Sequence, residues 1–213
     1  MRTAVVTGAN RGLGEAIAAE LGERGLRVVP TSREPRQGFV ALVVTRADHV
    51  TAFAQQLAGH GGVDVLVNNA GVSLDGFDER VVRRTLDANF LGAMRVTDAL
   101  LPSMHPGGRI VMVSSGIGSL TGVRGDLRKR FEDPRLTREA LLALVEEFPR
   151  DVAAGVHDRH GWPSRRLLPR RARGRLLTGG DAGRSRARSR RARADPQRFG
   201  TRACGSCARV VGS

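Results

Sequence analysis

Apolar and polar positions alternate with two different periods through the first 115 residues. Short apolar runs predict β-strands at Ala4–Val6, Leu26–Val29, Val40–Val44, Val63–Val67 and Arg109–Val113. Helical spacing predicts helices at Gly14–Arg24, His49–Leu57 and Asp78–Met104, the last of them one long or broken helix. Strands that alternate with helices indicate an α/β fold, a doubly wound parallel sheet of Rossmann-like type with helices on both faces. We expect the strand order 3-2-1-4-5.

The connection between the second and third strands is short. Only nine residues, Pro30–Gly38, join them. A parallel crossover usually takes about ten to twelve residues, most of them helical. We therefore expect the crossover helix to be missing or reduced to a turn, which leaves the third strand the least constrained of the five.

The pattern changes twice after residue 115. Helical spacing at Asp126–Phe131 and Thr137–Val152 predicts that residues 116–164 form a helical insertion after the fifth strand. Residues 165–213 show no sustained period and few large apolar side chains, so we expect an Arg-rich, disordered tail and a sheet that is incomplete at its C-terminal end. The chain thus divides into a core at 1–115, the insertion and the tail.

The charge is concentrated in that tail. The net charge is +14, but residues 1–164 hold 20 Lys+Arg against 19 Asp+Glu, and residues 165–213 hold 15 Arg against two acids. A basic tail binds nucleic-acid phosphates without sequence preference, and Phe199 alone offers base stacking there. We expect no specific nucleic-acid partner.

Other protein classes are disfavoured on similar grounds. Cys204 and Cys207 lack the second ligand pair that a zinc site needs, so we expect no metal. No apolar run approaches the length of a membrane span, and the first strand leads directly into a turn rather than following a signal peptide. We expect a cytoplasmic protein without membrane association.

A glycine-rich turn joins the first strand to the first helix. It reads Thr7-Gly8-Ala9-Asn10-Arg11-Gly12-Leu13-Gly14. Glycines let a backbone approach a pyrophosphate closely, and a helix N-terminus offers free N–H groups to it. The turn also fits a purely structural role. Under the dinucleotide reading, the candidate binding residues are Gly8, Asn10, Arg11, Gly12, Leu13 and Gly14.

A second motif, Asn68-Asn69-Ala70-Gly71, follows the fourth strand. Because adjacent parallel strands end at one edge of a sheet, both motifs should lie together where such sheets bind ligands. This pair of motifs resembles the short-chain dehydrogenase/reductase family. The resemblance implies that Asn69, Ala70 and Gly71 line a cofactor pocket. It also implies that Asn89 supports a proton relay at a helix kink and that Ser115 hydrogen-bonds a substrate carbonyl.

The end of the second strand bears on the choice of nicotinamide cofactor. Family members specific for NAD carry an acid there, whereas this chain has Thr31-Ser32-Arg33. Arg33 and Arg11 can clamp a 2′-phosphate by charge-assisted hydrogen bonds, although both also fit solvated surface arginines and Glu34 points the other way. We expect NADP (NADPH) to be preferred over NAD.

The catalytic Tyr-x-x-x-Lys of the family is absent. The chain contains no tyrosine, and its one lysine is Lys129. Residues up to Gly161-Trp162-Pro163-Ser164 resemble the carbonyl reductase branch, in which the two catalytic positions would fall at Leu167 and Arg171. Leucine cannot transfer a proton, and arginine stays charged. The family's aspartate after the third strand would fall at Val43.

Three interpretations follow. The resemblance implies an NADPH-dependent oxidoreductase acting on a small-molecule carbonyl substrate, inactive in this form. The alternatives are a nucleotide-binding module without catalysis and a frameshifted remnant. Match, charge and periodicity all change at Arg165, and the preceding residues use 19 arginines for one lysine, so residues 165–213 fit out-of-frame translation of a GC-rich gene. The oligomeric state stays open.

Overall fold

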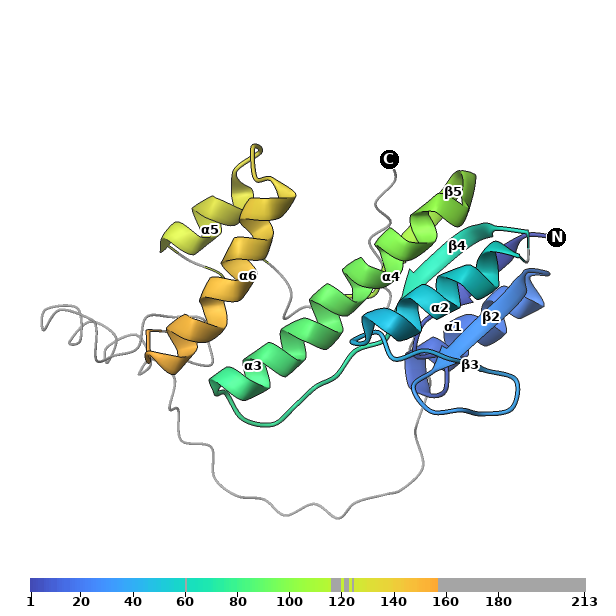
Figure 1. Cartoon of the computed structure of the whole chain (residues 1–213), viewed down its shortest axis with the longest axis horizontal. Coiled ribbons are helices and arrows are strands. Elements are labelled where there is room, and N and C mark those ends of the chain that lie inside the picture. Colours follow the sequence, from blue (N-terminus) through green and yellow to red (C-terminus); the bar gives the residue numbers. More distant parts are fainter. Residues whose placement is uncertain (60, 116–119, 121–122, 124, 157–213) are drawn as a thin grey trace, which may run out of the picture.

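The computed structural model describes residues 1–59, 61–115, 120, 123 and 125–156 (Figure 1). Five parallel strands form one sheet in the order β3-β2-β1-β4-β5, as predicted. The strands are β1 (Thr3–Val6), β2 (Arg27–Ser32), β3 (Val40–Ala41), β4 (Val63–Asn68) and β5 (Met104–Met112). The helices are α1 (Gly12–Glu23), α2 (Ala47–Ala58), α3 (Glu79–Leu86), α4 (Gly92–Leu100), α5 (Gly125–Glu132) and α6 (Arg138–Ala153). The fold is the Rossmann-like α/β type that the alternation predicts.

The centre of the sheet is buried on both faces. On one face, Val5 and Leu66 pack with Phe53 of α2 and with Val96 and Leu100 of α4. On the other face, α1 supplies a second apolar layer, in which Ile17 and Leu21 pack against Val6 and Val67. Covering both faces explains why the central strands are continuous apolar runs rather than alternating ones.

Three strands, β2, β3 and β5, differ by more than one residue from the sequence-based expectation. β2 continues to Ser32, because Thr31 and Ser32 pair with Val40 and Ala41. β3 ends at Ala41 instead of Val44: the amide of Leu42 still donates to Ser32, but the chain then turns toward α2. β5 begins at Met104 and ends at Met112, because the chain is already extended at Met104. No helix occupies the connection between β2 and β3, as expected.

The long helix predicted at Asp78–Met104 is broken and ends early. A π-helical turn at Asp87–Leu91 separates α3 from α4, although the two run as one rod in Figure 1. At the exit of this turn, a Cβ on Gly92 would lie 2.8 Å from Cγ2 of Val44. A 3-10 turn at Leu101–Ser103 then ends the helical segment and leads into β5.

Of the two helices after β5, α6 packs on the outer side of α3. α6 lies against α3, and ion pairs Arg83–Glu146 and Arg138–Asp98 link it to α3 and α4 (Figure 1). The Thr137 hydroxyl caps α6 by accepting from the amide of Ala140 at 3.2 Å. Both helices fall where the insertion was predicted. The tail at 165–213 lies outside the described residues, so its expected disorder stays a prediction.

Two kinds of feature are absent from the described residues. No helix among them is long and apolar enough to cross a bilayer. Within the same residues, no cluster of three His, Cys, Asp or Glu side chains could hold a metal ion.

Candidate functional site

The glycine-rich turn packs directly against the second motif. Gly8 and Gly12 adopt left-handed backbone conformations, with φ of +63° and +58°. A Cβ on Gly8 would lie 3.0 Å from Cα of Ala70. A Cβ on Gly14 would lie only 2.3 Å from Nδ2 of Asn69 and 2.4 Å from the Gly8 carbonyl oxygen. Glycine is therefore required at positions 8 and 14 for the two motifs to touch.

Thr7 and Asn69 hold this contact by hydrogen bonds. The amides of Asn69 and Ala70 both donate to Oγ1 of Thr7 at 2.9 Å. In return, Nδ2 of Asn69 donates to the carbonyl of Thr7 at 2.9 Å and to that of Gly8 at 3.1 Å. Thr7 is only 1% exposed, so these bonds are shielded from water. Asn69, predicted to line a cofactor pocket, thus uses both hydrogens of its side-chain amide to bind the turn.

The opposite side of the turn is open. No described residue lies within 4 Å of a Cβ built on Gly12, and Leu13 is 57% exposed. Arg11, at the start of α1, makes no side-chain cap, so the first backbone N–H groups of the helix keep their capacity to donate. Such groups, together with the positive end of the helix dipole, bind phosphate.

Basic side chains flank the turn on the β2 side. The predicted phosphate ligands Arg11 and Arg33 are exposed, and no described residue forms an ion pair with either. Arg36, which the sequence analysis did not single out, donates from Nη1 to the carbonyl of Asn10 at 3.2 Å. Its guanidinium also lies over the ring of Phe39, 5.1 Å from the centroid. The three arginines thus gather at the carboxyl end of β1 and β2.

Asn89 lies in the π-helical turn, consistent with the kink implied by the resemblance. Its Oδ1 accepts from the amide of Val72 at 2.7 Å, and its Nδ2 donates to the Val72 carbonyl at 2.9 Å. Gly71 makes room for it, because a Cβ there would lie 3.1 Å from Oδ1 of Asn89. The side chain therefore anchors the segment after β4, and its part in a proton relay stays a prediction.

Ser115 lies three residues beyond the end of β5 and is exposed, like Ser114. The strand end is held by the amide of Val113, which donates to the Asn68 carbonyl at 3.0 Å. Ser115 therefore follows the same sheet edge as the two motifs, as predicted. The positions expected for the family's tyrosine and lysine, Leu167 and Arg171, lie outside the described residues.

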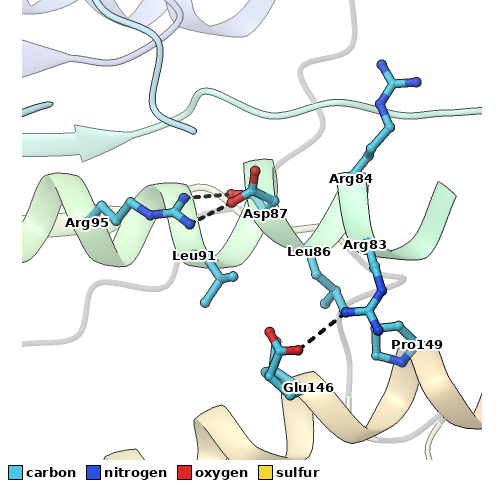
Figure 2. A pocket seen from close by; sticks show the side chains of 9 residues that line it. Arg83, Arg84, Leu86, Asp87, Leu91, Arg95, Glu146 and Pro149 are labelled. Atoms are coloured by element: carbon cyan, nitrogen blue, oxygen red, sulfur yellow. Dashed lines mark hydrogen bonds and ion pairs between the residues drawn. The ribbon is translucent and has the colours of Figure 1, made fainter. Parts of the chain in front are cut away.

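A separate hollow of about 350 Å³ lies between the α3–α4 segment and α6 (Figure 2). Leu86, Leu91 and Pro149 line it. Its charges pair with one another: Arg95 with Asp87 at 2.7 Å and Arg83 with Glu146 at 3.3 Å. Arg84 points away from it in Figure 2. Among the described residues, both acidic side chains that line the hollow are therefore paired, and we place the candidate site at the turn.

Comparison with known proteins agrees with this geometry. A family model described as short chain dehydrogenase matches residues 2–125. Carbonyl reductase (NADPH) 1 of Macaca fascicularis is 33% identical over 191 residues, covering 77% of this chain and 68% of that protein. Carbonyl reductase (NADPH) 3 of Rattus norvegicus is 36% identical over 186 residues, covering 76% of this chain and 67% of that protein. This chain spans about two thirds of the length of these relatives.

A solved structure extends the comparison to the fold. Salutaridine reductase from Papaver somniferum superposes with a TM-score of 0.68 at 28% identity, covering 77% of this chain and 75% of that one. The chain belongs to the short-chain dehydrogenase family. This family and the carbonyl reductase relatives place it among the oxidoreductases.

The family implies a nicotinamide dinucleotide, and the described residues fit its phosphate-bearing half. A Cβ built on Gly12 meets no described residue within 4 Å, and no side chain caps the first amides of α1. Three exposed arginines lie beside these amides. A dinucleotide's phosphates require such donors and cations.

Proposed function

We propose that this chain binds NADP(H) as the dinucleotide-binding part of a carbonyl-reducing oxidoreductase and does not itself reduce carbonyls at a useful rate. One observation carries the proposal. The open glycine turn at α1 is held rigid by Thr7 and Asn69, whereas the chain that contains it has no tyrosine. Binding and catalysis are thus separated within one polypeptide.

The binding half of the proposal assigns each group a partner. The α1 amides and the open backbone at Gly12 take the pyrophosphate, and Arg11 and Arg33 take the 2′-phosphate. The relatives named for NADPH support the preference for the phosphorylated cofactor. When bound, NADPH supplies the reducing equivalents for a small carbonyl compound.

The catalytic half lacks a proton donor. A positioned general acid contributes roughly a hundred- to ten-thousand-fold in rate. Ser115 can orient a carbonyl and Asn89 can hold a relay water, but neither supplies a proton near neutral pH. Arg171 does not donate a proton either, because a guanidinium stays protonated at every physiological pH. Loss of the ribose-binding lysine also removes cofactor positioning, which contributes several kcal/mol more.

The test combines calorimetry with absorbance assays on the purified chain. We expect NADPH to bind more tightly than NADH, and NADPH absorbance to stay constant with a panel of ketones and quinones. Tighter binding of NADH would contradict the roles of Arg11 and Arg33. Turnover near about one per second, an ordinary enzymatic rate, that disappears in Ser115→Ala would contradict the catalytic half.

A further inference from the structure

The hollow between the α3–α4 segment and α6 lies where both of its walls depart from regular helix. On one wall, the π-helical turn Asp87–Leu91 separates α3 from α4. On the other wall, α6 contains Pro149, which lines the hollow and is almost fully buried. Helices pack closely when the ridges of one enter the grooves of the other, and a π-turn or a proline interrupts that pattern. The space of about 350 Å³ stands at this interruption.

Pro149 also frees a hydrogen-bond acceptor in the wall formed by α6. In a regular helix, the carbonyl of Val145 accepts from the N–H of the residue four positions later. That residue is Pro149, which has no N–H. Val145 and Pro149 both line the hollow. A hydroxyl group on a molecule bound there can therefore supply the donor that the helix lacks.

The charged side chains of the hollow favour a neutral occupant. Arg95 binds the carboxylate of Asp87 at 2.7 Å and its carbonyl at 3.4 Å, and Arg83 binds Glu146 at 3.3 Å. Arg84 points away from the hollow (Figure 2). An anion would compete with the two carboxylates for their arginines. An aromatic ring instead takes the flat face of a guanidinium and leaves its carboxylate in place.

We propose that this hollow is a second ligand site, separate from the glycine-rich turn, and that it takes a small neutral phenol. Leu86, Leu91 and Pro149 provide apolar surface for the ring, and the two paired guanidinium groups provide a cationic face. The phenol hydroxyl donates to the Val145 carbonyl. The volume of about 350 Å³ lies near the lower end of the range of roughly 300–1,000 Å³ that is typical of small-molecule pockets.

The test is an NMR titration of the full chain, followed through its methyl resonances, with para-ethylphenol and matched analogues. The analogue para-ethylanisole lacks the hydroxyl hydrogen and should bind about fivefold more weakly, equivalent to one hydrogen bond of about 1 kcal/mol. Ethylcyclohexanol lacks the aromatic face and should bind about threefold more weakly. The phenol should shift the methyl resonances of Leu91 and Val145 and leave those of Leu13 unchanged. No cofactor is present, so the result does not depend on the proposed function.

Two substitutions in α6 test the assigned contacts. Pro149→Ala restores an N–H for the Val145 carbonyl, so the phenol should lose its advantage over the anisole, whatever the change in absolute affinity. Val145→Phe fills the hollow and should abolish detectable binding. Ala143→Phe adds a ring at an exposed position of the same helix and should leave binding unchanged.

Four results would overturn the assignment. The phenol could cause no methyl shifts at all, or it could shift Leu13 at the glycine-rich turn in place of Leu91. The para-ethylbenzoate anion could bind more tightly than the phenol, which would assign the hollow to anions. Finally, Pro149→Ala could keep the full preference for the phenol over the anisole, which would show that the Val145 carbonyl is not the acceptor.

Discussion

The carboxyl ends of β1 and β5 lie at one edge of the same sheet, but their residues are held in different ways. After β1, every contact that shapes the turn comes from residues 7–71, and Thr7 is almost fully buried. After β5, Ser114 and Ser115 are exposed. Because hydrogen bonds shielded from water hold a backbone more firmly than exposed ones, the first end is the more firmly held of the two among the described residues.

β5 itself shows the same difference. It is the outer strand of the described sheet, and its apolar residues Ile110 and Val111 are half-buried while Met112 is 39% exposed. The buried Val5 and Leu66 in the central strands have no such exposure. An edge strand with exposed apolar residues is prone to pairing with other chains. Within the described residues, the sheet is therefore more fully buried beneath the glycine-rich turn than at β5.

Substitution of Gly14 should have the largest effect on stability and cofactor binding, because Gly14 lies where the glycine-rich turn packs against Asn69. Gly14→Ala places a Cβ 2.3 Å from Nδ2 of Asn69, against groups fixed by hydrogen bonds. We expect a loss of about 3 kcal/mol in unfolding free energy, typical of overpacking, and no detectable NADPH binding. Gly22→Ala is the matched control on the same helix, since a Cβ there meets nothing within 4 Å. Urea unfolding that shows equal effects for the two variants would contradict the packing argument.

Thr7→Val tests the hydrogen bonds without changing the shape. It leaves the amides of Asn69 and Ala70 without their acceptor. Two partly buried amides without an acceptor should cost about 2 kcal/mol of unfolding free energy. The control Thr85→Val removes only a bond to the Val81 carbonyl within α3 and should cost less than about 0.5 kcal/mol. Similar values for both would mean that the Thr7 bonds contribute little.

Asn89→Asp distinguishes the two bonds that anchor Val72. The carboxylate keeps the acceptor for the Val72 amide but loses the donor to its carbonyl. We expect a loss of about 1 kcal/mol in unfolding free energy, and faster amide exchange at Val72 in Asn89→Ala than in Asn89→Asp. Unchanged exchange in both variants would show that Asn89 does not hold this segment.

The smallest expected effect is on the pH dependence of stability, and it arises at the amino ends of β1 and β4. The Thr3 amide, donating at 2.6 Å, and then His105, at 3.0 Å, hold the pKa of Asp64 below its ordinary value. A lowered folded-state pKa contributes stability above the unfolded-state pKa of about 3.9, and this is lost as pH falls through the folded-state pKa. Asp64→Asn should flatten the loss of stability below about pH 4. His105→Gln should leave most of that slope, because Thr3 is the larger cause, and a flat profile in His105→Gln would contradict this ranking.

The strand order and the location of the turn were predictable from the sequence. Apolar runs mark strands that are buried on both faces, and glycines mark a tight turn, so both signals are local in the chain. The sequence did not reveal the bonds between Thr7 and Asn69, although Thr7 belongs to the motif, since their partners are 62 residues apart. Arg36 was missed because only the folded loop brings it to Asn10. The predicted helix runs to Met104, whereas Leu101 is 57% exposed and belongs to a 3-10 turn.

The most direct test compares NADP⁺ with the same molecule lacking only its nicotinamide, 2′-phospho-ADP-ribose. If the phosphate turn is ordered and the catalytic end is not, the nicotinamide contributes little, and titration should give dissociation constants within about twofold of each other. Both should be lost in Gly14→Ala. A dissociation constant for NADP⁺ that is lower by about tenfold or more, equivalent to about 1.4 kcal/mol held by the nicotinamide, would contradict the account, because it would show that the end near Ser115 is also assembled.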